Sequence, residues 1–200
     1  MTSSQKNEND LIFNLFNDSR TVYRLNDIAL LLGESNFDSL NKRLNYFVRT
    51  GKLLNPRKGI YAKSGYNAEE LACRIFTPSY ISLDYVLQKS GVIFQYSSPI
   101  SSVSYLSRSI TIEENTFGYR KIKNEILVDT TGIIRNDNGV NIATVERALL
   151  DTLYLNADCY FDNLNAIDQT VINKLLPVYN SKILVQRVTK LFKNDQPEQT

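Results

Sequence analysis

Three stretches of helical periodicity near the amino terminus constrain the fold more than any other feature of the chain. The first covers residues 8–17. The second opens at Leu25 or Asn26 and closes at Gly33, where a left-handed C-cap is expected. The third covers residues 37–50 and is ended by Gly51. Its apolar face consists of Phe37, Leu40, Leu44, Phe47 and Val48. The pattern predicts three helices, of which the third is amphipathic and basic.

The second and third of these helices, joined by a tight glycine turn, match a helix-turn-helix, whose second helix enters the major groove of DNA. Residues 52–61 then indicate two short strands around the turn Asn-Pro-Arg-Lys-Gly, with two cations at the tip. A hairpin of this kind directly after the helices is typical of a winged helix. We therefore predict a winged helix-turn-helix domain over residues 1–66.

Charge is unevenly distributed along the chain, although the formal net charge is only +2. Residues 1–66 carry ten basic and six acidic side chains, a balance of +4, whereas residues 67–200 have a balance of −2. Residues 36–63 hold seven Lys or Arg and a single acid, Asp38. A local basic field of this size attracts phosphate even when the whole protein is almost neutral. The charge pattern therefore favours DNA as the partner of the amino-terminal domain.

Candidate DNA-binding residues follow from the way in which a recognition helix meets the groove. Its amino-terminal half approaches the base edges, which predicts base contacts from Asn36, Ser39, Lys42 and Arg43. Phosphate contacts are predicted from Tyr46, Arg49, Arg57 and Lys58, the last two at the tip of the hairpin.

Residues 67–200 predict a second, α+β domain. Asn67 and Glu70 suggest a capping box at the start of a helix that runs to residue 76, and Thr77-Pro78 ends it. Further helices are expected over residues 83–90, 145–155 with Thr144 as cap, 167–179 and 181–193, and a frayed tail over 194–200.

The middle of this domain changes to a periodicity of two, which predicts an antiparallel sheet. The expected strands cover residues 100–106, 108–114, 117–123 and 125–128, with Asn115-Thr116 as a hairpin turn. A further hairpin is expected through residues 133–134 and 140–142, with 136–139 as its turn.

The absence of histidine from the sequence excludes Ser-His-Asp and Cys-His nucleophiles and HExxH zinc sites. Cys73 and Cys159 form no CxxC pair, so we expect two reduced thiols. No apolar run approaches the roughly 18 residues of a membrane span, and the amino terminus lacks an apolar signal region. We expect a soluble, cytoplasmic protein that is not an enzyme and uses no cofactor or metal.

Carboxylates in the second domain nevertheless leave one enzymatic alternative open, a metal-dependent nuclease. It would use Glu113, Glu125 and Asp129, with Glu114, Lys121 and Lys123 nearby. The simpler interpretation of Glu113 and Glu114 is that of solvated charges beside a hairpin turn. Arg147 and Asp151, four residues apart on one helix, are expected to form a surface ion pair.

From about Asp10 to Phe192 the chain resembles the AbiEi family of antitoxins, transcriptional regulators of viral defence systems. The resemblance is carried by four motifs in the order of the family: residues 57–62 at the hairpin, 78–83 before a helix, 116–120 in a hairpin, and 142–151. Val145 departs from the family, which usually has proline at this first helical position.

The resemblance implies a bipartite regulator. Its winged helix would bind inverted repeats of double-stranded DNA in its own promoter, and its carboxy-terminal domain would counter a nucleotidyltransferase-like toxin encoded beside it. In the type IV arrangement of the family, antitoxin and toxin need not form a stable complex. The family supplies no catalytic residues. A second alternative is that the winged helix is a protein-interaction module and the chain an adaptor that binds the toxin directly.

Overall fold

The computed structural model describes residues 11–94 and 99–194. It divides into two compact units. The amino-terminal unit comprises residues up to 77 together with 112–114 and 136–140, and the carboxy-terminal unit comprises the remainder. The boundary expected after residue 66 thus lies inside the amino-terminal unit. Residues 8–10 of the first expected helix and residues 195–200 of the expected tail lie outside the described part of the chain.

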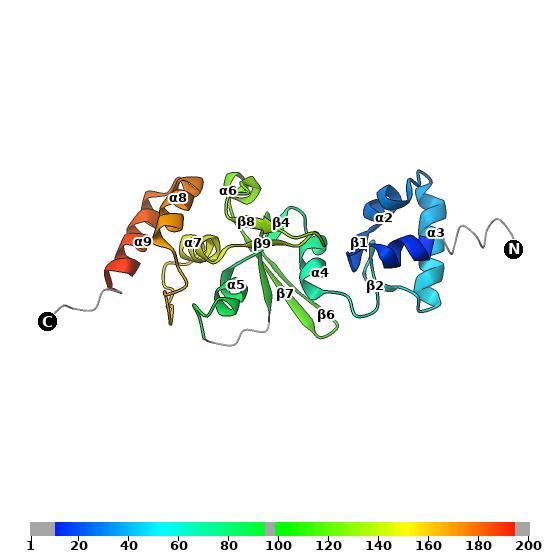
Figure 1. Ribbon diagram of the computed structural model, residues 1–200, viewed down its shortest axis with the longest axis horizontal. Helices are drawn as coiled ribbons and strands as arrows, with labels where there is room; N and C mark the ends of the chain where they lie inside the picture. Colours follow the sequence, from blue (N-terminus) through cyan, green and yellow to red (C-terminus); the bar gives the residue numbers. More distant parts are fainter. Residues whose placement is uncertain (1–10, 95–98, 195–200) are drawn as a thin grey trace, which may run out of the picture. The chain divides into compact units, whose positions relative to one another are not determined.

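The helices of the amino-terminal unit follow the predicted periodicity closely (Figure 1). Residues 11–17 are helical, followed by α2 (Leu25–Leu32), α3 (Phe37–Arg49) and α4 (Ala68–Ile75). Gly33 ends α2 with a φ of 63°, and its N–H donates back to the carbonyls of Ala29 and Leu30. A left-handed residue is needed there, which explains why the glycine marks the helix end in the sequence.

Three short strands complete this unit: β1 (Val22–Arg24), β2 (Leu54–Arg57) and β3 (Ile60–Ala62). The order is β1-β3-β2, and both pairs are antiparallel. The hairpin of β2 and β3 lies where the sequence predicts it. β1 was not predicted, because three residues between a polar turn and a helix are too few to show alternation.

One hydrophobic core joins the helices to the sheet of this unit. Leu40, Leu44 and Phe47 supply the buried face of α3. They pack with side chains of the first helix, β1, α2 and the hairpin, namely Leu11, Leu15, Tyr23, Ile28, Ala29, Leu53 and Tyr61. The predicted apolar stripe is therefore the side of α3 that faces inward, and its opposite side is free for other contacts.

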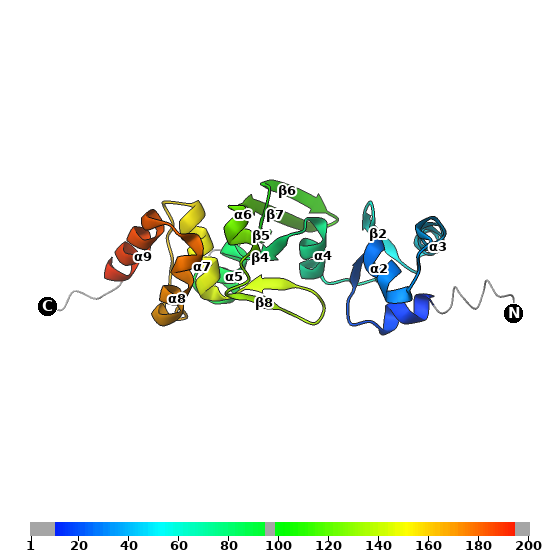
Figure 2. The same cartoon turned by 90° about the horizontal axis from the view of Figure 1, so that it is seen from above.

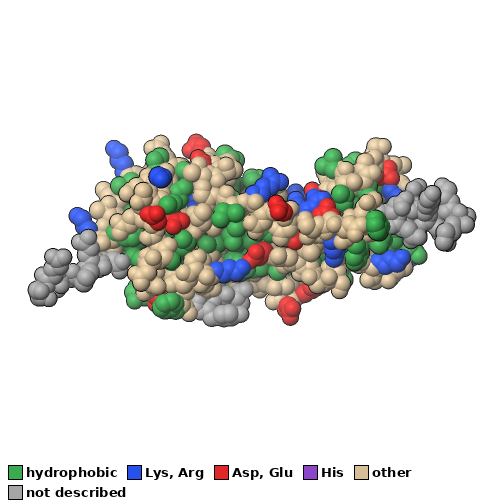
Figure 3. Space-filling view, in the orientation of Figure 1, with side chains coloured by type: hydrophobic (Ala, Val, Ile, Leu, Met, Phe, Trp, Pro, Cys, Tyr) green, Lys and Arg blue, Asp and Glu red, His purple; other side chains and the backbone are tan. Residues whose placement is uncertain are grey.

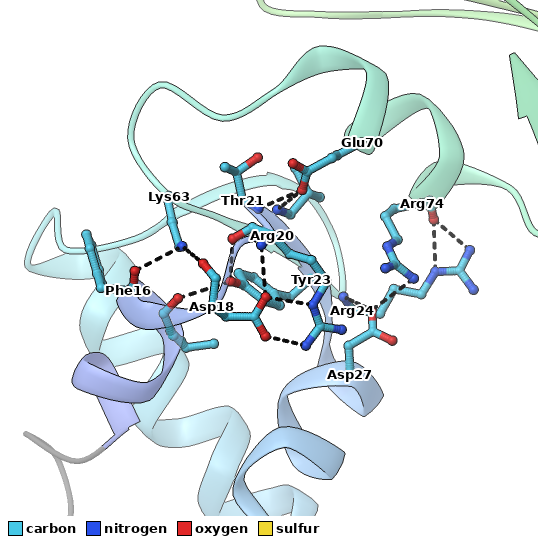
Figure 4. Close-up of polar contacts among 12 residues, drawn as sticks. Phe16, Asp18, Arg20, Thr21, Tyr23, Arg24, Asp27, Lys63, Glu70 and Arg74 are labelled. Carbon is cyan, nitrogen blue, oxygen red and sulfur yellow. Dashed lines mark hydrogen bonds and ion pairs between the residues drawn. The ribbon is translucent and has the colours of Figure 1, made fainter. Parts of the chain in front are cut away.

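Glu70 of α4 is buried, with 2% of its surface exposed, and it binds the backbone of β1. One carboxylate oxygen accepts from the N–H groups of Thr21 and Val22 at 2.6 and 3.0 Å (Figure 4). The predicted capping box is therefore only half right. Asn67 does cap α4 by accepting from the N–H of Glu69, but Glu70 satisfies a strand edge instead of the helix start.

We expect Glu70→Ala to destabilise the amino-terminal unit by about 2 kcal/mol, because it leaves the buried N–H of Val22 and the partly buried N–H of Thr21 without an acceptor. Amide hydrogen exchange should accelerate at Thr21 and Val22 in this variant. Glu114→Ala, which removes an exposed carboxylate, is the control and should leave these two amides unchanged. Equal protection of the two amides in Glu70→Ala and the wild type would contradict the assigned role.

Arginines in the same unit tie α2, β1 and α4 together (Figure 4). The Arg24 guanidinium donates twice to the carbonyl of Arg74, and the Arg24 N–H donates to Asp27 at 2.8 Å. Arg74 in turn lies 3.5 Å from Asp27. In the turn before β1, the hydrogen bond from Arg20 lowers the pKa of Asp18. Arg20, Arg24 and Arg74 are thus held by internal contacts.

The carboxy-terminal unit is built on a six-stranded sheet with the order β6-β7-β5-β4-β9-β8 (Figure 2). Its strands are β4 (Ser79–Ile81), β5 (Ile100–Ser104), β6 (Arg108–Ile112), β7 (Asn115–Lys121), β8 (Ile133–Arg135) and β9 (Asn141–Ala143). The sheet is mixed, whereas an antiparallel one was expected. β5 runs parallel to β7, and β4 runs parallel to β9. Alternation within a strand does not report its direction relative to a neighbour, which explains the error.

Two further expectations for this unit are wrong in detail. The segment expected as a strand over 125–128 is a short helix, α6 (Asn124–Val128). Four apolar or charged residues are too few to distinguish the two periodicities. The hairpin turn between β6 and β7 lies at Glu113–Glu114 rather than at Asn115-Thr116, and Glu113 has a φ of 53°. The β8–β9 hairpin agrees with the prediction.

The helices of this unit confirm the predicted segments: α5 (Leu83–Lys89), α7 (Val145–Leu155), α8 (Gln169–Tyr179) and α9 (Lys182–Asn194). Thr144 caps α7 by accepting from the N–H of Arg147 at 3.3 Å. Asn180, in the left-handed conformation, separates α8 from α9. Both of these helices contact α7 (Figure 1).

Arg147 and Asp151 do not form the expected surface pair, because both side chains are fully buried. The Arg147 guanidinium donates to the carbonyls of Thr131 and Ile126 and to the Tyr80 hydroxyl. Asp151 accepts from the hydroxyls of Tyr179, Ser82 and Tyr80, at 2.7, 2.8 and 3.2 Å. Spacing by four residues places two charges on one helix face, but it does not say whether that face is inside the fold.

A search for helices that could cross a membrane found none among residues 11–94 and 99–194.

Candidate nucleic-acid interface

The outward face of α3 carries most of the predicted DNA-binding residues. Because Leu40, Leu44 and Phe47 point into the core, residues half a turn away point out. The exposed residues of α3 include Ser39, Lys42, Asn45, Tyr46 and Arg49. Lys42, Asn45 and Arg49 follow one another at spacings of three and four, so they form one row on the helix surface.

Tyr46 and Arg49 lie together at the carboxy-terminal end of this face. The Arg49 guanidinium stacks over the Tyr46 ring at 5.7 Å from its centroid. Stacking of this kind orients the guanidinium and leaves its edge free to donate. Lys52, three residues after Arg49, is also exposed, and its Nζ lies 5.5 Å from the centroid of the Phe47 ring.

Asn36 and Ser39 stand at the start of α3, as predicted, but they also form its cap. The Asn36 side chain accepts from the Ser39 N–H at 3.0 Å, while the Asn36 N–H donates to Glu34. The carbonyl oxygen of the Asn36 amide is therefore used by the helix, and its NH₂ group remains for a contact outside the chain.

Arg43 differs from the other predicted residues in being tied to a carboxylate. One of its terminal nitrogens lies 2.6 Å from Glu34, and both side chains are about three-quarters buried. Its Nε is also buried and has no hydrogen-bond partner within the described residues. The structure thus separates Arg43 from the row of Lys42, Asn45 and Arg49.

The hairpin places its two predicted cations differently. Asn55 holds the turn by donating to the carbonyls of Arg57 and Ile60 at 3.0 and 2.7 Å. Lys58 is exposed at the tip. Arg57 is half-buried, and its guanidinium lies 5.4 Å from the centre of the Phe76 ring. Lys58 is therefore the freer of the two side chains.

Asn45 and Lys52 were not among the predicted site residues. Asn45 could have been found from its spacing, since it lies three residues after Lys42 and four before Arg49. Lys52 follows the glycine that ends α3, and its position relative to the helix depends on the turn. Sequence periodicity carries no information on that geometry.

The carboxylates considered for nuclease chemistry have separate surroundings. Glu113 accepts from the Tyr66 hydroxyl at 3.0 Å, and burial together with this contact raises the pKa of Tyr66 to about 12. Asp129 accepts from Thr131, which lowers its pKa, and Glu125 is exposed on α6. Across the two described stretches, no group of three or more His, Cys, Asp or Glu is placed to hold a metal ion.

Comparisons with known proteins add little to this picture. No family model matches the chain, and no curated protein matches its sequence. Among solved structures, the crystal structure of the RV2827C protein from Mycobacterium tuberculosis matches with a TM-score of 0.48 and 15% sequence identity. That match covers 94% of this chain and 76% of the other. The functional assignment therefore rests on the residues of this chain.

Proposed function

We propose that the chain is a DNA-binding transcriptional autorepressor and antitoxin, with α3 as the recognition helix of a winged helix-turn-helix. In this proposal the hairpin of β2 and β3 is the wing. The partner is double-stranded DNA with inverted repeats in the promoter of its own operon.

The outward row of Lys42, Asn45 and Arg49 on α3 is the observation that carries the proposal. It combines two cations and an amide on a helix that is anchored from behind by three buried apolar residues. A rigid helix with this chemistry can place an amide against base edges and cations against phosphate oxygens. Lys52, just after the end of α3, and Lys58, at the tip of the hairpin, add two exposed cations.

The contacts within the chain refine the expected roles. We assign base contacts to the free NH₂ of Asn36, to Ser39, Lys42 and Asn45. Phosphate contacts are assigned to Tyr46, Arg49, Lys52 and Lys58. Arg43 and Arg57 are instead positioning residues, because one is paired with Glu34 and the other stacks on Phe76.

The antitoxin half of the proposal comes from the family resemblance and assigns no catalytic residue. Its toxin would be a nucleotidyltransferase-like protein encoded beside this chain, and a stable complex is not required. The motif at residues 142–151 is explained by folding, since Arg147 and Asp151 form the buried network of the carboxy-terminal unit. The residues that act against the toxin must therefore lie elsewhere on that unit.

A two-part genetic experiment tests the two halves separately. A reporter placed behind the operon's own promoter should be repressed by the full chain and released by Lys42→Gln together with Arg49→Gln. Growth in the presence of the neighbouring gene product should be restored by the full chain and by that same double variant. Two results would count against the assignment. One is failure to restore growth while repression of the reporter persists, and the other is unchanged repression by the double variant.

Exposed apolar side chains favour a second candidate, an adaptor that binds the toxin directly. Leu30 of α2 is 83% exposed, and with Phe37 it lines a groove of about 460 Å³. Exposed aliphatic and aromatic side chains around one groove are a common feature of protein contacts. If this candidate holds, the neighbouring gene product co-purifies with the wild-type chain and is lost in Leu30→Ser, whereas DNA binding is retained.

A further inference from the structure

The two last helices carry a second concentration of positive charge, remote in sequence from α3. Residues 169–194 contain five basic side chains and no acidic one. Four of the five are exposed lysines: Lys174, Lys182, Lys190 and Lys193. Lysine and arginine side chains stand out over the α8–α9 end of the viewed surface (Figure 3). Asp168, the N-cap of α8, offsets the charge of Lys174, whereas residues 169–194 themselves contribute no carboxylate, and a basic cluster of this kind attracts a polyanion.

Three of these lysines form one row on α9. Leu184 and Val188 are the buried residues of the helix, so Lys182, Lys190 and Lys193 lie on the opposite side. At 1.5 Å per residue, the row extends over about 16 Å. Gln186 and Thr189 are exposed between the lysines: Gln186 offers an uncharged donor and acceptor, and Thr189, whose hydroxyl donates to the carbonyl of Val185 at 2.9 Å, offers an acceptor. We refer to Lys182, Gln186, Thr189, Lys190 and Lys193 as the α9 face.

A groove with an exposed aromatic ring adjoins the α9 face. Its volume is about 490 Å³, and Tyr160, Lys190 and Leu191 line it. Tyr160 is 81% exposed, so its ring is accessible to a stacking partner beside the groove. Arg187 lines the same groove but donates to the carbonyls at the end of α7, including that of Leu153. Arg187 is therefore held by internal contacts, and Lys190 is the exposed cation of the groove.

One carboxylate, that of Asp158, also lines the groove. Its charge opposes phosphate binding inside the groove itself, so the phosphates must follow the lysine row outside. A carboxylate beside an aromatic ring is suited to accept from the exocyclic amino group of a base. All of these charges are satisfied when a base lies in the groove and the phosphates of the same strand lie along α9.

We propose that the α9 face and Tyr160 form a binding site for single-stranded RNA. Stacking on Tyr160 requires an unpaired base, which excludes a regular duplex. Gln186 and Thr189 lie between the lysines, where the 2′-hydroxyl groups of a ribose backbone would pass, and this selects RNA over DNA. The site lies within the carboxy-terminal unit, and the proposal does not depend on DNA binding by α3.

Fluorescence anisotropy of the full chain with a labelled oligocytidylate of about 20 nucleotides, whose bases carry the exocyclic amino group expected beside Asp158, tests the site. Lys182→Gln, Lys190→Gln and Lys193→Gln together should weaken binding roughly 20-fold at moderate salt, because three phosphate contacts are lost. Tyr160→Ala should weaken it roughly 10-fold through loss of stacking, whereas Tyr160→Phe should bind as the wild type does. Tyr160 is exposed, so neither substitution threatens folding.

A matched control removes three charges from other exposed positions of the same unit: Lys121→Gln, Lys123→Gln and Arg135→Gln. This control and the double variant of Lys42 and Arg49 should both keep the wild-type affinity for RNA. Failure of DNA binding with retained RNA binding would therefore overturn only the function proposed for α3. Equal affinity for a poly-glutamate chain or for oligodeoxycytidylate, or equal affinity of Tyr160→Ala and the wild type, would overturn the RNA site.

Discussion

Arg147→Met should lower the free energy of unfolding of the carboxy-terminal unit by about 3–5 kcal/mol at neutral pH. The substitution removes the only cation beside Asp151 among the contacts shown, and it leaves a fully buried carboxylate without its charge partner. It also removes the donors to the carbonyls of Thr131 and Ile126. Urea unfolding followed by the near-UV circular dichroism of tyrosine is the measurement, because Tyr80 and Tyr179 belong to the same network.

The loss of unfolding free energy in Arg147→Met should depend on pH in a definite direction. Burial raises the pKa of Asp151, while Arg147 and the hydroxyls of Tyr179, Ser82 and Tyr80 act in the opposite sense. Without Arg147 the folded-state pKa rises further above the unfolded value. A carboxyl with a raised folded-state pKa loses stability as the pH rises from the unfolded pKa towards the folded one. The loss of stability should therefore be smaller near pH 4 than near pH 7, and the part that remains near pH 4 reflects the lost donors to Thr131 and Ile126.

Two variants separate the ion pair from the rest of the network. Asp151→Asn keeps an acceptor for the tyrosine and serine hydroxyls, and we expect it to cost less than Arg147→Met, about 1–3 kcal/mol. Arg135→Met removes an exposed arginine and should change stability by less than about 0.5 kcal/mol. A loss in Arg147→Met no greater than that in Arg135→Met would contradict the buried-pair interpretation.

The second large effect is expected on DNA. Lys42→Gln combined with Arg49→Gln should weaken binding to the promoter about 10- to 100-fold and reduce the salt slope by about 1, since one base contact and one phosphate contact are lost. Both side chains are exposed, so the fold should be unaffected. The control is Lys121→Gln with Lys123→Gln, which removes the same charge from the other unit. Equal weakening by both pairs would indicate a non-specific charge effect and would contradict the assignment to α3.

The helices of the amino-terminal unit were predictable because each one has a long apolar stripe and a glycine or polar stop. The periodicity of residues 37–50 specifies Leu40, Leu44 and Phe47 as the buried face, and the structure places them there. A single helix pattern is a local property of the chain, which is why one sequence suffices to recognise it.

Short elements and buried charges were not predictable in the same way. β1 and β4 have three residues each, fewer than a repeat needs. The direction of β5 relative to β7 depends on a strand order that no local pattern contains. Arg147 and Asp151 have the spacing of a surface pair, and only the packing of Tyr80 and Tyr179 around them makes the pair internal.

The sequence predicted the exposure of only some of the candidate residues. The pattern correctly placed Lys42 and Arg49 on the exposed side of α3, because the helix period determines this. Pairing of Arg43 with Glu34 depends on the turn between α2 and α3, and stacking of Arg57 on Phe76 joins residues 19 positions apart. Tertiary contacts of this kind decide which cations remain free for a ligand.

Salt-dependent binding to the inverted repeat upstream of the gene tests the central claim most directly. If the three cations Arg49, Lys52 and Lys58 contact phosphates, the logarithm of the binding constant should fall with the logarithm of the salt concentration at a slope of about −2.7 for each bound chain. Binding should be tighter than to a scrambled duplex of the same length. A slope near zero, or no binding to the repeat at low salt, would contradict the account.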